Sequence, residues 1–85
     1  MEQAIKNETI IDVRSEQEFA MAHLHGSINI PLQELPDRMD EIKKMKNIVL
    51  CCASGARSAA ATQYLLQQNI SCANGGPWNN LKQTT

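Results

Sequence analysis

The sequence predicts an α/β fold in which a central, mostly parallel sheet is flanked by helices on both faces. Short runs of β-branched or apolar residues alternate with segments of helical character along the chain. This order is typical of parallel sheets, because each parallel strand pair needs a crossover connection. The run at 48–52, IVLCC, has no polar residue. Such a short apolar run indicates a strand buried on both faces.

The first predicted elements are a strand and a helix. Thr9–Val13 (TIIDV) is β-branched and apolar, as expected of a buried strand. Ser15 and Glu18 are three residues apart, which is the spacing of a capping box. We therefore expect a helix that begins after Ser15 and runs to about His23, with Phe19 facing the core.

A second strand and helix are predicted next. Ser27–Ile30 alternates in polarity and stops at a proline, which indicates a short strand. Leu35, Met39, Ile42 and Met45 then recur at steps of four, three and three. This period is typical of one face of a helix.

The last predicted segment contains two strands around a helix. Ile48–Cys52 forms the central strand, and a loop of small residues, 53–56, follows it. Residues 57–68 are rich in helix formers. Ile70–Ala73 is predicted as a last short strand, broken by 75–77 (Gly-Gly-Pro).

Composition excludes several classes of function. The 85 residues suit one small domain, and 8 basic against 9 acidic residues predict no nucleic-acid or membrane partner. No apolar run approaches the roughly 20 residues of a membrane span. The N-terminus lacks the features of a signal peptide, so we expect a cytoplasmic location, although a removed signal peptide would leave the same sequence. The three cysteines show no metal-ligand spacing, so no metal is expected.

Cys52 is the candidate nucleophile, because it lies at the end of a predicted strand and just before a helix. The backbone N–H groups of the small loop residues could converge on one point, and the helix N-terminus would add positive potential. A thiol held there should lose its proton readily. The loop consists of Ala53, Ser54, Gly55 and Ala56.

The same sequence leaves other interpretations open. Cys51 and Cys72 are better explained as core residues, and Asp12 with Arg14 as an ion pair. Arg57 would stand at the unfavourable end of the helix dipole unless an anion lies nearby. A bound oxyanion could be that anion, as could Asp12 or another carboxylate.

Three segments together resemble the rhodanese family. The first is Ile11-Asp12-Val13-Arg14, with Glu18-Phe19, His23 and 26–31 (GSINIP) after it. The second is 52–58 (CASGARS), which is similar to the family's Cys-x-x-Gly-x-Arg-Ser loop, and the third is Gly75-Gly76 with Trp78. The resemblance covers about residues 9 to 81, and residues 1–8 would be a shortened N-terminal segment of a single domain at 1–85.

This resemblance implies a small rhodanese-like domain that acts as a sulfurtransferase. Cys52 would take sulfur as a persulfide from thiosulfate, another small sulfur-containing anion or a protein persulfide, and pass it to a thiol or cyanide. Asp12 and Arg14 would brace the loop, and no cofactor is implied. The donor would be held by the loop residues and the two that follow them: Ala53, Ser54, Gly55, Ala56, Arg57 and Ser58.

Two alternatives remain at this point. A rhodanese fold can be a non-catalytic binding or sensor module. A cysteine phosphatase is the other alternative, because Cys51-x5-Arg57 has the phosphatase spacing. Gly55 lies three residues after Cys52 and four after Cys51, which favours the sulfurtransferase register.

Overall fold

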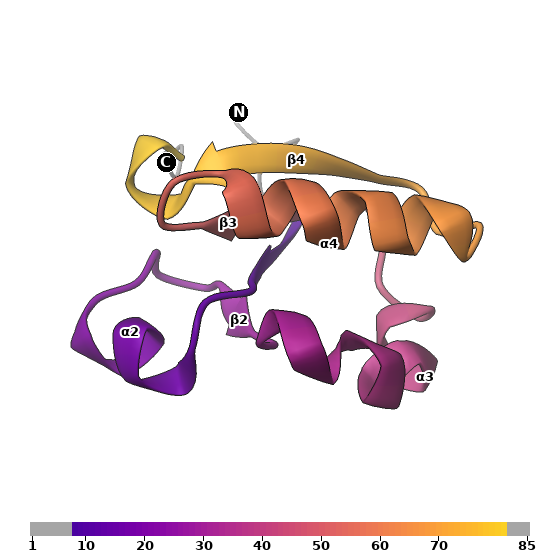
Figure 1. The fold of residues 1–85 in the computed structure, drawn as a ribbon, viewed down its shortest axis with the longest axis horizontal. Coiled ribbons are helices and arrows are strands. Elements are labelled where there is room, and N and C mark those ends of the chain that lie inside the picture. The colour runs from indigo at the N-terminus through magenta and orange to yellow at the C-terminus, as the bar shows by residue number, and fades with distance from the viewer. Residues whose placement is uncertain (1–7, 82–85) are drawn as a thin grey trace.

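Four parallel strands form the centre of the molecule. The computed structural model describes residues 8–81, and its sheet has the order β2-β1-β3-β4 (Figure 1). Every strand pair in this sheet is parallel, which confirms the predicted α/β class. The strands are β1 (Thr9–Asp12), β2 (Ile28–Asn29), β3 (Ile48–Cys52) and β4 (Cys72–Pro77).

The hydrophobic core lies between the sheet and the helical segments that pack on it. Leu50 of β3 and Ile11 of β1 are fully buried, together with Ala61 and Leu65 from one helix. Burial of these side chains orients that helix along β3 and β4, as Figure 1 shows. The helical segments are α2 (Glu16–Met21), η1 (Leu32–Arg38), α3 (Met39–Ile42), α4 (Ala56–Gln67) and η2 (Trp78–Asn80).

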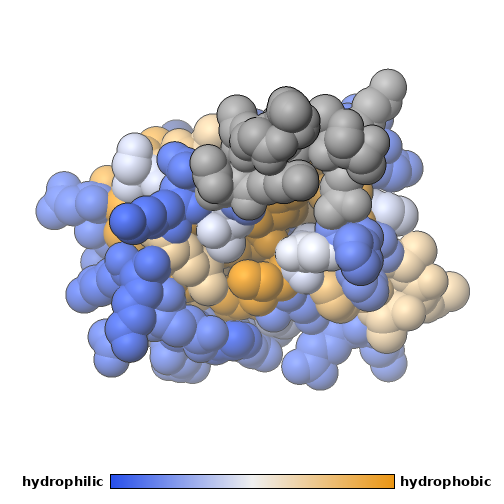
Figure 2. Space-filling model, turned by 180° about the vertical axis from the view of Figure 1, so that it is seen from behind, coloured by the Kyte–Doolittle hydropathy of each residue, from blue (hydrophilic) through white to orange (hydrophobic). Residues whose placement is uncertain are grey.

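The end of the described chain packs on the other side of the sheet. Val49 alternates with core-facing neighbours along β3 and therefore points away from α4. A Cβ built on Gly75 would lie 2.7 Å from Val49 Cγ1 and 3.2 Å from Leu81 Cδ1, so only glycine fits there. Figure 2 shows the reverse side of the molecule, where polar side chains lie beside and below an apolar area.

The sequence predicts one helix for the apolar stripe at residues 35–45, but the structure has two helical segments there. The 3-10 helix η1 precedes a short α3. Pro36 lies inside η1 and has no N–H to donate, so a regular α-helix cannot run through it. The apolar stripe nevertheless faces the core, since Leu35 and Ile42 are buried and Met39 and Met45 pack against the cluster.

The prediction that the last strand breaks at the glycine pair is wrong. β4 runs on through Gly75 and Gly76 to Pro77. The register shifts between Leu50 and Cys51, and Gly75 is the extra residue. This bulge lets the strand continue, and the proline is tolerated because β4 is an edge strand. As a result Pro77 pairs with residue 52, beside the candidate site.

Within the residues that the structure describes, no helix has the length and apolar character needed to cross a membrane.

Candidate active site

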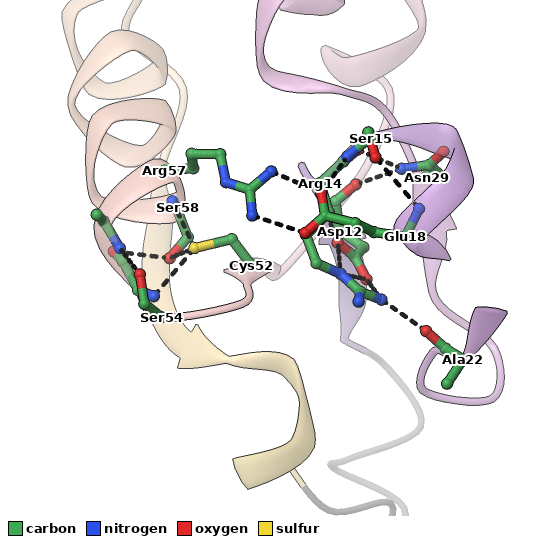
Figure 3. A network of polar contacts seen from close by, with 12 residues as sticks. Asp12, Arg14, Ser15, Glu18, Ala22, Asn29, Cys52, Ser54, Arg57 and Ser58 are labelled. Atoms are coloured by element: carbon green, nitrogen blue, oxygen red, sulfur yellow. Dashed lines mark hydrogen bonds and ion pairs between the residues drawn. The ribbon is translucent and has the colours of Figure 1, made fainter. Parts of the chain in front are cut away.

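Cys52 lies at the carboxyl end of β3, and its sulfur accepts hydrogen bonds from the backbone that follows. The N–H of Gly55 donates to Cys52 Sγ at 3.0 Å and the N–H of Ser58 at 3.2 Å (Figure 3). Gly55 has φ 103° and is the N-cap of α4, a helix of 12 residues. This left-handed turn, which glycine adopts without strain, directs the N–H groups toward the sulfur.

The surroundings of Cys52 favour its thiolate. Burial would raise the pKa of this thiol, but hydrogen bonds from the Ser58 hydroxyl and from the N–H groups of Ser58, Gly55 and Ser54 outweigh burial and lower it. The Cys52 side chain is fully buried, whereas Ala53 and Ser54 above it are exposed. The residue therefore combines an activated thiol with a cover of small loop residues.

Ser58 connects Cys52 to a residue that the sequence did not point to, Asn74. The buried Ser58 Oγ lies 3.5 Å from Cys52 Sγ, 3.1 Å from the carbonyl of Gly55 and 2.7 Å from Asn74 Oδ1. The N–H of Gly76 donates to the same Oδ1 at 2.9 Å, which identifies it as the oxygen. The single Ser58 proton can thus go to the sulfur, to Asn74 Oδ1 or to the Gly55 carbonyl, and Asn74 is the nearest of the three.

Arg57 has a carboxylate partner, and that partner is Glu18. Arg57 Nη1 donates to Glu18 Oε1 at 2.8 Å, and Nη2 donates to Oε2 at 3.0 Å. The N–H of Ser15 also donates to Glu18 Oε1, at 3.0 Å, and completes the predicted capping box. Glu18 therefore offsets the unfavourable position of Arg57 at a helix N-terminus. The sequence identified Glu18 as a capping residue and as part of the family resemblance, and did not pair it with Arg57.

Asp12 and Arg14 form a buried ion pair beside this site. Arg14 Nη2 donates to Asp12 Oδ2 at 2.7 Å and to the carbonyl of Ala22 at 2.8 Å. The Arg14 guanidinium carbon also lies 4.8 Å from the centre of the Trp78 ring. These contacts join β1 to the segment after α2 and to η2. The suggestion that the pair braces the loop at 53–58 stays a prediction.

The other two cysteines have different surroundings. Cys51 is fully buried, and burial, with the Asp12 carboxylate, raises its pKa to about 12. Cys72 is half-buried, burial raises its pKa, and its Sγ lies 3.7 Å from the carbonyl of Thr62. All three cysteines are unpaired. Cys52 alone among them has a lowered pKa.

Comparison with known proteins is consistent with this arrangement. The family described as "Rhodanese-like domain" matches residues 1–80. A protein named sulfurtransferase from Allochromatium vinosum is 39% identical over 59 residues, which are 69% of this chain and 55% of that protein. The chain thus spans about half the length of this relative.

Solved structures share the fold. A rhodanese-related protein from Thermoplasma volcanium superposes with a TM-score of 0.79 at 33% identity, over 92% of this chain and 82% of that one. A structure described as a rhodanese with anions, from E. coli, gives a TM-score of 0.80 at 29% identity, over 91% of this chain and 94% of that one.

Proposed function

Because this chain belongs to the rhodanese-like domain family, we propose that it is a sulfurtransferase that carries sulfur on Cys52 as a persulfide. The observation that carries this proposal is the pair of backbone N–H bonds to Cys52 Sγ, from Gly55 and Ser58. N–H groups that stabilise a thiolate also stabilise the anion of the persulfide that replaces it.

The proposed first half-reaction is a displacement at sulfur. The Cys52 thiolate attacks the outer sulfur of thiosulfate, a new S–S bond forms, and the old S–S bond breaks with its electron pair on sulfite. Since Cys52 has no exposed surface, the exposed loop residues Ala53 and Ser54 must shift to admit the donor.

The second half-reaction returns the enzyme to its starting state. A thiol or cyanide attacks the outer sulfur of the persulfide and takes it away, and the Cys52 thiolate leaves. In this scheme the loop residues 53–56 and Ser58 hold the persulfide, and Arg57 contacts the charged end of the donor.

The environment of Cys51 disfavours the phosphatase alternative. A phosphatase register would need a Cys51 thiolate, and burial raises the pKa of Cys51 to about 12. At neutral pH this thiol stays protonated and is a poor nucleophile.

Unpaired thiols suit a reducing compartment, so we also propose a cytoplasmic location.

A sulfur-transfer assay separates the proposed enzyme from a binding module. Incubation with thiosulfate and cyanide should yield thiocyanate, and Cys52→Ser should abolish this product. Cys72→Ser is the matched control and should retain most activity, because the Cys72 Sγ lies near the carbonyl of Thr62 in the middle of α4 and not at the loop that follows Cys52. Absence of thiocyanate with thiosulfate and with an alkyl persulfide as donor would leave the binding module as the better explanation.

A further inference from the structure

The partner of Arg57 is a carboxylate that accepts hydrogen bonds from two sides. Both oxygens of Glu18 accept from the Arg57 guanidinium, at 2.8 and 3.0 Å, and the Ser15 N–H fixes Oε1 from the other side. Hydrogen bonds from Arg57 and Ser15 lower the pKa of Glu18 to about 2. Glu18 is therefore ionised at neutral pH and is oriented toward Arg57 (Figure 3).

Glu18 cancels the positive charge of the candidate loop. The segment 53–58 contains a single charged side chain, Arg57. The neighbouring Arg14 is already paired with Asp12 at 2.7 Å. A donor that reaches Cys52 thus meets two neutralised pairs in place of an unpaired arginine.

The charge of the donor decides how much this arrangement matters. A dianion such as thiosulfate must share Arg57 with Glu18 or displace it, and either outcome places two anions near one guanidinium. The repulsion between Glu18 and the dianion weakens binding of the dianion. A donor with one negative charge or none is affected less.

We propose that Glu18 is a specificity-determining residue that selects against dianionic donors and leaves a persulfide, R–S–SH, as the donor class of this site. This proposal rests on the proposed function of Cys52. In the step, the Cys52 thiolate bonds to the outer sulfur of R–S–SH. The S–S bond of the donor breaks, R–S⁻ leaves with its electron pair, and Cys52–S–SH retains the proton.

The test compares two donors in wild type and Glu18→Gln. Thiosulfate is the dianionic donor, and the hydropersulfide of 2-mercaptoethanol carries at most one negative charge. Glutamine keeps an oxygen for the Ser15 N–H and removes only the charge. We expect the thiosulfate KM to fall roughly 3- to 10-fold, because the pair is half-exposed and partly screened. The hydropersulfide KM should change less than about twofold.

A control makes the outcome specific to Glu18. Glu16→Gln removes the same charge from the same helix at an exposed position, and should leave both KM values unchanged. A merely structural role of Glu18 would alter stability and both donors alike.

The result that overturns the proposal is an unchanged ratio of the two KM values in Glu18→Gln. An equal effect of Glu16→Gln would also overturn it, because long-range charge would then be the cause. If the proposed function of Cys52 is wrong, wild type will form no persulfide with either donor. This outcome differs from an unchanged ratio of the two KM values.

Discussion

At the scale of single residues, the site depends on where one proton of Ser58 points. Its hydroxyl lies 2.7 Å from Asn74 Oδ1 and 3.5 Å from Cys52 Sγ. When the thiol is protonated, Cys52 donates to Ser58 and Ser58 donates to Asn74. When the thiolate forms, the hydroxyl proton stabilises it by turning to the sulfur. Asn74, together with the Gly55 carbonyl, therefore competes with the thiolate for the same proton.

Removal of the Ser58 hydroxyl should make Cys52 less reactive. In Ser58→Ala the thiolate loses its hydroxyl donor and keeps the N–H groups, so its pKa should rise. We expect alkylation by iodoacetamide at pH 7 to slow roughly 3- to 10-fold. Alkylation rates followed against pH, in a Cys51→Ser Cys72→Ser background, measure this directly. An unchanged profile would show that the backbone N–H groups suffice.

Removal of the competing acceptor should have the opposite effect. In Asn74→Ala the Ser58 proton loses its nearest acceptor and keeps only the Gly55 carbonyl and the sulfur, so the Cys52 pKa should fall and alkylation at pH 6 should accelerate. Asn80→Ala, which removes an exposed asparagine of η2, is the control. A slower reaction in Asn74→Ala would mean that Asn74 supports Ser58 and does not compete with the sulfur.

At the scale of elements, the two glycines around the site have different physical roles. Gly55 has φ 103°, and a Cβ there would meet only ordinary contacts, at 3.6 Å from Gly76 Cα. Gly75 has no such φ, but a Cβ there would lie 2.7 Å from Val49 Cγ1. The first glycine serves the loop conformation and the second serves the packing of β4 on β3.

These roles predict different outcomes for two alanine variants. Gly55→Ala should destabilise the protein by about 1–2 kcal/mol through backbone strain, and should also misdirect the N–H bonded to Cys52 and reduce sulfur transfer. Gly75→Ala should lower stability through overpacking, by about 1–3 kcal/mol, with a smaller effect on the alkylation rate of the remaining folded protein. Urea unfolding and alkylation rates, measured together, compare the two. If the two variants changed the free energy of unfolding and the alkylation rate to the same extent, the two glycines would not have the different roles described above.

Local signals in the sequence predicted most elements, and long-range contacts account for what they missed. The capping box at Ser15 and the strand Ile48–Cys52 were predicted because their determinants are neighbours in sequence. The bulge at Gly75 depends on pairing with β3, which no local pattern reports. For the site, the small loop after Cys52 was visible, whereas Arg57 and Glu18 are 39 residues apart and Ser58 and Asn74 are 16 apart.

At the scale of the whole molecule, the parallel sheet places β1 and β3 side by side. The Asp12–Arg14 and Glu18–Arg57 ion pairs therefore both lie around the carboxyl end of β3, where Cys52 is. The carboxyl ends of parallel strands are where sites occur in such sheets. Arg14, from the end of β1, and Arg57, from α4 after β3, each arrive with a carboxylate partner. The fold therefore organises charge around Cys52 before any donor binds.

This charge organisation predicts how stability depends on pH. Glu18 has a folded-state pKa of about 2, below the ordinary value of 4.5. A lowered pKa contributes stability that is present above pH 4.5 and is lost as pH falls toward 2. Wild type should therefore lose more of its stability between pH 6 and pH 3 than Glu18→Gln does, by a small margin, since the pair is half-exposed. Urea unfolding at the two pH values measures the difference, and parallel losses in both proteins would contradict it.

The most direct test of the central claim is mass spectrometry of the intact protein and its peptides after treatment with a sulfane-sulfur donor. We predict one added sulfur atom, located on Cys52, that is absent in Cys52→Ser and present in Cys51→Ser. It should disappear on addition of cyanide. A sulfur located on Cys51 or Cys72, or a Cys52→Ser protein that still gains it, would contradict the account.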